Sequence, residues 1–218
     1  MKAALVESPG LLAFRDERGR NLLHLCCGVK PKDRLSPGDA MKTAAVLLDA
    51  GLDIDREAFS EGNWKATPLW YAVGRGENLA LAKYLLERGA DPENCLWAAA
   101  FRDDVAAIRL LVAGGASLDP VVEDETPFLA AVKVSHFRAA EALLDLGADV
   151  NHRDSKGMTA LHYMLKKDSP AEHFRRLIRH GARVDLPDRA GVTAGETLAR
   201  KRSPGFRKLA AEIARPRA

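Results

Sequence analysis

The chain has 218 residues, of which 47% are hydrophobic and 29% are charged, and its formal net charge is +3. This composition is that of a folded globular protein and excludes a largely disordered chain. No apolar run approaches the roughly 18 to 20 residues of a membrane-spanning helix, so we expect no membrane association.

The N-terminal segment, Met1–Phe14, is predicted to form a capping helix. It lacks a basic stretch followed by an uninterrupted apolar one, which a secretory signal requires. The three cysteines, Cys26, Cys27 and Cys95, cannot form an even-numbered disulfide framework, so we expect reduced, structural thiols. These features predict a cytoplasmic protein, and the richness in Ala, Arg and Leu resembles that of bacterial chains.

A two-part pattern repeats along the rest of the chain. One half is a pair of branched apolar residues followed by Gly and a small or apolar residue, and the five pairs begin at Leu47, Leu85, Leu110, Leu143 and Leu177. The other half is a helix start, where Thr or Asn can accept a hydrogen bond from the first-turn amides. The six helix starts are Asn21, Thr67, Asn94, Thr126, Thr159 and Thr193. A recurring unit of two helices and a turn indicates a stack in which no unit folds alone.

The best-preserved unit resembles the junction of ankyrin repeats. It runs through Gly147-Ala148-Asp149-Val150-Asn151 and on to Thr159-Ala160-Leu161-His162, and the resemblance extends from about Arg15 to Asp188. It implies an all-α solenoid of stacked helix-turn-helix units, with short β-turn fingers at the junctions. It also implies that the fingers and the inner helices form a concave face that binds another protein, and that the repeats carry no chemistry.

On this basis we predict a single ankyrin-repeat domain over 1–218. It would comprise an N-terminal cap helix (1–15), five repeats (16–55, 56–90, 91–118, 119–150 and 151–185) and a C-terminal cap repeat (186–218). Three stretches depart from the regular pattern. An insertion around 29–39 joins the first inner and outer helices, the second finger is lengthened over 57–64, and the third finger is almost absent between Asp91 and Asn94.

The candidate binding residues lie at the variable concave positions of the family and on the aromatic part of the inner helices. Trp64 and Tyr71 are the predicted aromatic anchors, because such residues dominate interface hot spots. Trp70 and Trp97 occupy the position of the family's motif His, so we expect them to pack between repeats. The predicted partner-binding residues are Asn63, Trp64, Tyr71, Arg75, Glu123, Glu125, Lys133, Lys156, Lys166 and Arg189.

Charge suggests further possibilities. From Lys166 onward 14 basic residues face 6 acidic ones, so the C-terminal end carries a net charge of +8. The resemblance to ankyrin repeats implies a protein-protein interaction module, and we predict that it is monomeric. The alternatives are an inhibitor or antitoxin-like protein that occludes a partner enzyme and, with less support, a nucleic-acid or anionic-surface binder that uses the basic end.

Catalysis is not expected. His24 and His162 occupy the structural motif position of the repeats, where imidazole joins finger to helix. The chain has no paired Cys/His spacing for a metal and no glycine motif that would cradle a phosphate. We thus predict no catalytic residue, no metal and no cofactor.

Overall fold

The structure is a computed structural model that describes residues 2–31, 36–58, 60, 61 and 64–213, with the backbone alone for 60, 61, 64 and 65. The described residues form two compact units, Met1–Ser117 and Leu118–Ala218. The division falls at the predicted border between the third and fourth repeats. The prediction of a single domain remains a prediction.

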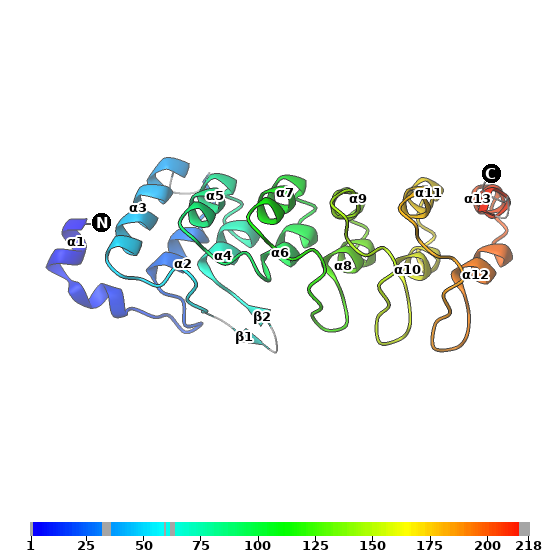
Figure 1. Cartoon of the computed structure of the whole chain (residues 1–218). Coiled ribbons are helices and arrows are strands. Elements are labelled where there is room, and N and C mark those ends of the chain that lie inside the picture. Colours follow the sequence, from blue (N-terminus) through cyan, green and yellow to red (C-terminus); the bar gives the residue numbers. More distant parts are fainter. Residues whose placement is uncertain (1, 32–35, 59, 62–63, 214–218) are drawn as a thin grey trace. The chain divides into compact units, whose positions relative to one another are not determined.

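The first unit stacks three helix pairs behind an N-terminal segment (Figure 1). The inner helices pack in the order α2, α4, α6, and the outer helices pack in the order α3, α5, α7. Its elements are α1 (Lys2–Glu7), the 3-10 helix η1 (Pro9–Ala13), α2 (Leu22–Cys27), α3 (Pro37–Asp49), α4 (Pro68–Gly74), α5 (Leu79–Glu87), α6 (Cys95–Phe101) and α7 (Val105–Ala113).

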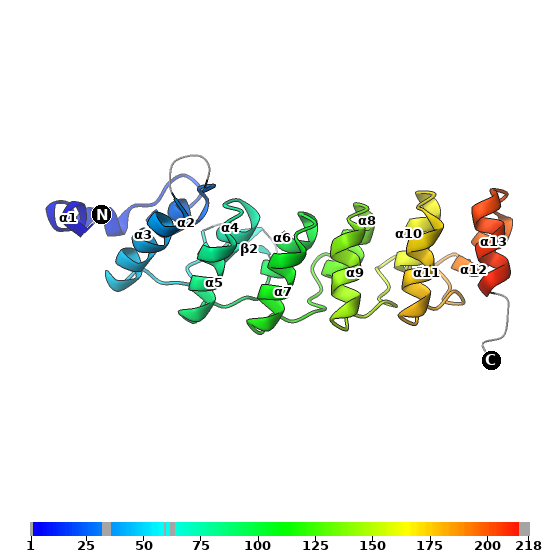
Figure 2. The ribbon, with the colours of Figure 1, turned by 90° about the horizontal axis from the view of Figure 1, so that it is seen from above.

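The second unit repeats the same arrangement with greater regularity. Its outer helices lie side by side when seen from above (Figure 2), and a finger loop precedes each inner helix. Its elements are α8 (Pro127–Lys133), α9 (Phe137–Asp145), α10 (Ala160–Lys166), α11 (Ala171–Arg179), α12 (Ala194–Arg200) and α13 (Pro204–Ile213). The two helices per repeat that the sequence pattern predicts are therefore present throughout this unit.

The predicted helix starts act as N-caps, with one exception. The side chains of Thr67 and Thr126 accept hydrogen bonds from the amides of Trp70 and Leu129, at 3.3 and 3.2 Å. Asn94 also precedes its helix, but its φ is 63° and its side chain makes no capping hydrogen bond. The shortened junction before α6 brings the chain into the helix through a left-handed residue, so the expected cap does not form there.

The first unit contains three irregular segments. The N-terminal segment forms α1 and η1 rather than one helix, because Pro9 lacks the amide that would continue the α-helix. The lengthened second finger forms an antiparallel hairpin of β1 (Ser60–Glu61) and β2 (Trp64–Lys65). The insertion lies between α2 and α3, and residues 32–35 within it are outside the described residues.

The core of each unit consists of the apolar pairs found in the sequence. One member of each pair is fully buried or nearly so, namely Leu47, Leu85, Leu111, Leu143 and Leu177. The Gly after each pair closes the outer helix with a positive φ, for example 102° at Gly147, which favours glycine. The helix–turn–helix pattern of the sequence is thus realised in both units.

The three cysteines lie in the core of the first unit. Cys26, Cys27 and Cys95 are free and buried, as predicted. Burial raises the pKa of Cys26 to about 11 and that of Cys95 to about 12, so both stay protonated at neutral pH.

Among the described residues, no helix has the length and apolar composition of a membrane-spanning segment.

Candidate partner-binding surface

The two motif histidines hold the repeats together. His24 Nδ1 contacts the Asn21 side chain at 2.6 Å, and its Nε2 contacts the carbonyl of Arg56 at 2.7 Å. His162 makes the equivalent contacts with Thr159 and with the carbonyl of Val192. Burial lowers the pKa of His24, which favours the neutral imidazole. Both rings therefore use their nitrogens to join a finger to an inner helix, which is the role that the sequence predicted.

The aromatic residues of α4 divide into a buried ring and a groove wall. Tyr71 is only 6% exposed, and its ring packs edge-on against those of His24 and Trp70, with centroids 5.6 and 5.2 Å apart. The guanidinium of Arg20 lies 5.8 Å from the Tyr71 centroid. A ring enclosed in this way has little surface to offer a partner, so its packing role is the better supported one.

A half-open groove of about 360 Å³ lies at the C-terminal ends of α4 and α6. We call it the aromatic groove, and it is lined by Trp70, Gly74, Arg75, Trp97, Ala98, Phe101 and Arg102. Phe101 is 61% exposed, whereas Trp97 is 9% exposed. The tryptophans thus form a fixed base while Phe101 stands at the opening.

Small residues allow α4 and α6 to approach each other in this groove. A Cβ at Gly74 would lie 3.3 Å from the Cβ of Ala98 and 3.7 Å from the Trp70 ring. Arg102 is fixed by an ion pair with Glu77 at 3.0 Å, while Arg75 is exposed. Arg75 is the one predicted contact residue that lines the groove. Phe101 was missed, although it lies seven residues after the helix start Asn94, at the same repeat position as Lys133 and Lys166.

In the second unit, three of the predicted residues gather around a tyrosine. Lys133 Nζ lies 4.7 Å and Lys166 Nζ lies 5.9 Å from the ring centroid of Tyr163, within the range of cation–π attraction. Lys133 also pairs with Glu125. We call Glu125, Lys133, Tyr163 and Lys166 the tyrosine–lysine cluster.

A carboxylate fixes the tyrosine of this cluster. The Tyr163 hydroxyl donates a hydrogen bond to Asp154, and burial together with this bond raises the pKa of Tyr163 to about 12. Burial acts to raise the pKa of Asp154, but hydrogen bonds from Tyr163 and from the backbone amides of Met158 and Lys156 hold it below its usual value. The tyrosine is half-buried and rigidly oriented.

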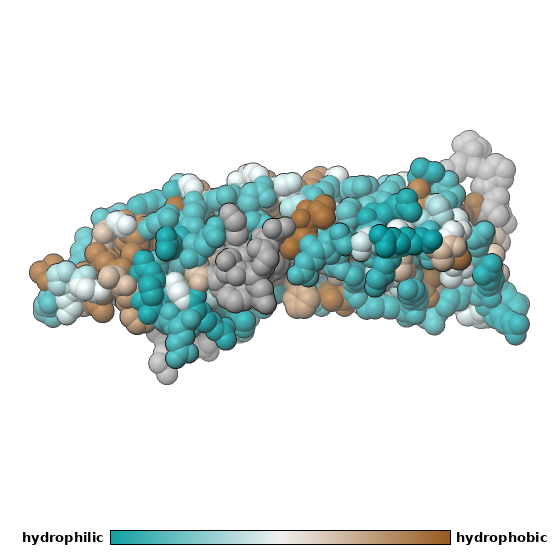
Figure 3. Space-filling view, turned by 90° about the horizontal axis from the view of Figure 1, so that it is seen from below, coloured by the Kyte–Doolittle hydropathy of each residue, from teal (hydrophilic) through white to brown (hydrophobic). Residues whose placement is uncertain are grey.

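The remaining predicted residues lie on fingers. Glu123, Lys156 and Arg189 are exposed, and the Arg189 amide donates to the Lys156 carbonyl at 2.9 Å, so the last two fingers are linked. Seen from the finger side, the surface over the fingers of the second unit is mostly hydrophilic (Figure 3). Asn63 lies outside the described residues. Trp64 is described by its backbone only, in β2.

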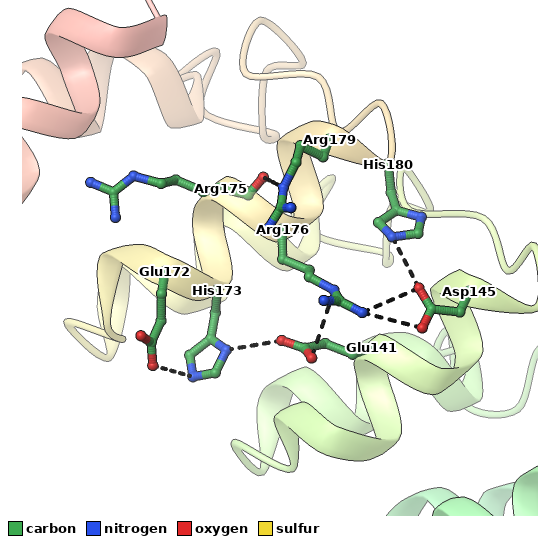
Figure 4. Close-up of polar contacts among 8 residues, drawn as sticks. All are labelled: Glu141, Asp145, Glu172, His173, Arg175, Arg176, Arg179 and His180. Atoms are coloured by element: carbon green, nitrogen blue, oxygen red, sulfur yellow. Dashed lines mark hydrogen bonds and ion pairs between the residues drawn. The ribbon is translucent and has the colours of Figure 1, made fainter.

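The basic end offers less free charge than its composition suggests. Between α9 and α11, Arg176 pairs with Glu141 and Asp145, and both carboxylates also contact His173 or His180 (Figure 4). Arg175 points to the opposite side of α11 and pairs with Glu212. These pairs occupy two of the arginines, Arg175 and Arg176, that a nucleic acid would need. Within the described part of the chain, no three His, Cys, Asp or Glu side chains converge as metal ligands would.

Comparison with known proteins points to one family. The family model for ankyrin repeats (3 copies) matches residues 69–154 and 95–188, which together exceed half of the chain. An ankyrin repeat domain from Acinetobacter baumannii has the same fold, with a TM-score of 0.68, 22% sequence identity, and coverage of 87% of this chain and 94% of that one.

Sequence relatives are diverse in source and length. A putative ankyrin repeat protein of fowlpox virus is 29% identical over 61% of this chain and 22% of its own length. Human inversin is 30% identical over 61% of this chain and 12% of its own length, and a putative ankyrin repeat-containing protein of Treponema pallidum is 35% identical over 43% and 31%. The chain thus spans less than a third of each of these relatives. Ankyrin repeats are generally protein-protein interaction modules and are typically non-catalytic.

Proposed function

The chain belongs to the ankyrin-repeat family, and we propose that it is a non-catalytic module that binds a partner protein through the aromatic groove and the tyrosine–lysine cluster. The observation that carries the proposal is the exposed Phe101 ring beside the buried Trp97 and the half-buried Trp70. A concave groove lined by aromatic side chains, with an exposed apolar ring at its opening, has the composition of a binding site.

The aromatic groove has the composition of an interface hot spot. Trp and Arg are enriched among residues whose truncation costs most binding energy, and both line this groove. Its volume of about 360 Å³ suits a single large apolar side chain of a partner. Because Trp97 and Arg102 are already held in place, binding would cost little side-chain entropy.

The second surface favours an acidic segment. Lys133, Lys166 and Lys156 project from neighbouring inner helices and fingers, and Glu125 compensates only one of these charges. Complementary charge mainly raises the association rate and selects the partner. We place Glu123 and Arg189 at the rim of this surface and Tyr163 at its centre.

Affinity capture with matched variants tests the proposal. Phe101→Ser should greatly reduce recovery of the bound protein from a lysate of the source organism, because it removes the exposed ring of the groove. Leu79→Ser is the control, since Leu79 is also apolar and 41% exposed in the same unit but lies outside the groove. Once the partner is identified by mass spectrometry, calorimetry should show at least roughly tenfold weaker binding for Phe101→Ser, the scale of a hot-spot residue.

Salt separates the two surfaces. Lys133→Glu should slow association with the same partner, and the effect should shrink as ionic strength rises. Equal retention of the partner by Phe101→Ser, Lys133→Glu and the Leu79→Ser control would show that neither surface is the binding site.

A further inference from the structure

Successive repeat junctions are joined by one recurring hydrogen bond. In the first unit, Asp55 accepts from the Asp91 amide at 2.9 Å and Glu93 accepts from the Ser117 amide at 3.3 Å. In the second unit, Asp119 accepts from the Asp149 amide at 3.1 Å and Asn151 accepts from the Arg183 amide at 2.8 Å. In every case the acceptor lies three residues after the small or apolar residue that follows the glycine of the outer helix, as Asp119 does after Ala116. A junction therefore covers the one before it and offers an acceptor to the one after it.

Within residues 64–213, no amide is recorded as covering the last junction, Gly181–Asp185, in this way. Asp185 occupies the acceptor position, but its carboxylate receives the guanidinium of Arg183 from its own loop, at 3.1 and 2.8 Å. The small residue of this junction is more open than its counterparts. Ala182 is half-buried, whereas the equivalent residues of the earlier junctions are at most 9% exposed, namely Leu52, Ala90, Ala116 and Ala148.

A recess of about 600 Å³ marks the open junction, and we call it the terminal groove. It lies on the outer side of the second unit, between α11, α13 and the last junction loop. Its apolar surface comes from Ile178, Ala182, Val184, Leu209 and Ile213.

The charged rim of the terminal groove is unbalanced. Three arginines and two carboxylates line it, which leaves a net charge of +1. Arg175 is paired with Glu212 at 2.7 Å, and Arg183 is paired with Asp185. The third arginine, Arg179, donates to the carbonyl of Arg175 at 3.4 Å, so its charge remains for an acidic group.

We propose that the terminal groove binds an acidic peptide segment of a partner protein that takes the place of a further repeat junction. A small apolar residue of the segment would contact Ile178 and Val184, a backbone amide would donate to Asp185, and a carboxylate would meet Arg179. This surface is separate from the aromatic groove, so either can fail without the other.

The chain itself supplies a suitable probe. A heptapeptide blocked at both ends that copies residues 145–151 (Asp-Leu-Gly-Ala-Asp-Val-Asn) is a junction that already stacks on another one, and it carries two negative charges. The intact chain is labelled at its isoleucine δ1 methyl groups and titrated by NMR. Only four isoleucines are present, and Ile178 and Ile213 line the terminal groove while Ile54 and Ile108 lie in the first unit.

We expect saturable shifts of the Ile178 and Ile213 methyl signals, with those of Ile54 and Ile108 unchanged. The peptide with Asp145→Asn and Asp149→Asn should bind more weakly. In the protein, Arg179→Glu should weaken binding about fivefold, the scale of one exposed ion pair. Arg138→Glu makes the same charge change at an exposed residue of α9 that lies outside the groove, and it should leave binding unchanged.

Three results would overturn the proposal. One is the absence of shifts at Ile178 and Ile213, and another is equal weakening by Arg179→Glu and Arg138→Glu, which would indicate attraction by net charge alone. The third is concentration-dependent association in sedimentation velocity that Ile178→Arg abolishes, because a second copy of the chain would then occupy the groove.

Discussion

Tyr71 in the first unit and Tyr163 in the second occupy the same position, four residues after a helix start, yet their surroundings differ. Tyr71 is enclosed by His24 and Trp70, whereas Tyr163 is half-buried beneath Lys133 and Lys166. The two tyrosines differ in exposure because of one residue in the repeat before them, the seventh after that repeat's helix start. That residue is Gly28 in the first unit, where a Cβ would lie 3.4 Å from the Tyr71 ring, and Lys133 in the second. A repeat's surface is therefore set partly by its neighbour.

The largest expected effect comes from truncating the two tyrosines. Tyr71→Ala should lower the free energy of unfolding by about 4 kcal/mol, because it leaves a cavity in the core of the stack. Tyr163→Ala should cost about 1 kcal/mol, since it removes mainly one hydrogen bond and partly exposed surface. Urea denaturation followed by circular dichroism measures both, and equal losses would show that the two positions are equivalent after all.

A core substitution tests whether the units unfold together. Leu143→Ala should cost about 3 kcal/mol, because Leu143 is fully buried in the second unit. The three tryptophans, Trp64, Trp70 and Trp97, all lie in the first unit, so fluorescence reports that unit alone. If the chain is one domain, the fluorescence midpoint in urea should fall along with the circular dichroism midpoint. An unchanged fluorescence midpoint would mean two independently folding units.

Acid should weaken the first unit through His24. Its pKa is lower in the folded state than the unfolded value of 6.5, so the unfolded chain binds the proton more readily. The resulting stability is present in full above pH 6.5 and is lost as the pH falls through that value toward the folded pKa. His24→Gln should flatten the dependence of the urea midpoint between pH 7.5 and 5.5, roughly the range in which a histidine titrates. A wild-type midpoint that rises on acidification would contradict this assignment.

The smallest effect is expected on the outer face of the second unit. Arg176→Ala removes the ion pairs with Glu141 and Asp145, which are about one-third exposed or more, so the loss should be about 1 kcal/mol or less. The loss should shrink further in 1 M NaCl. A large loss that salt does not change would assign Arg176 to packing rather than to charge.

The repeat pattern was sufficient to predict the helices, because caps, apolar pairs and terminal glycines act locally and recur. It also identified the structural histidines and the buried cysteines. Asn94 was misjudged as an ordinary cap because the path of the chain before α6 depends on the shortened junction, not on the residue type. Whether a tyrosine is enclosed or open depends on a residue some 30 to 43 positions away, as with Lys133 and Gly28, and local patterns do not contain that information.

Local sequence patterns also identified only part of the candidate site. Arg75, Lys133 and Lys166 were identified from their variable positions, and the structure places each on a groove or cluster. Phe101 occupies the same repeat position as Lys133 and Lys166, so the pattern could have identified it. Tyr163 was overlooked because its importance comes from contacts between repeats. Tyr71 was selected for its residue type, but its ring is enclosed.

The hydrogen bonds between junctions give the stack a direction. In each of these four hydrogen bonds the acceptor side chain belongs to the earlier junction and the amide donor to the following one. Two repeats stacked in opposite directions would therefore not form this bond. A repeat duplicated in the same orientation could form this hydrogen bond with both of its neighbours. If a repeat were deleted, the junctions on either side of it could form the bond with each other. A change in the number of repeats would therefore preserve this hydrogen-bond pattern, although the side-chain contacts between repeats would still have to fit.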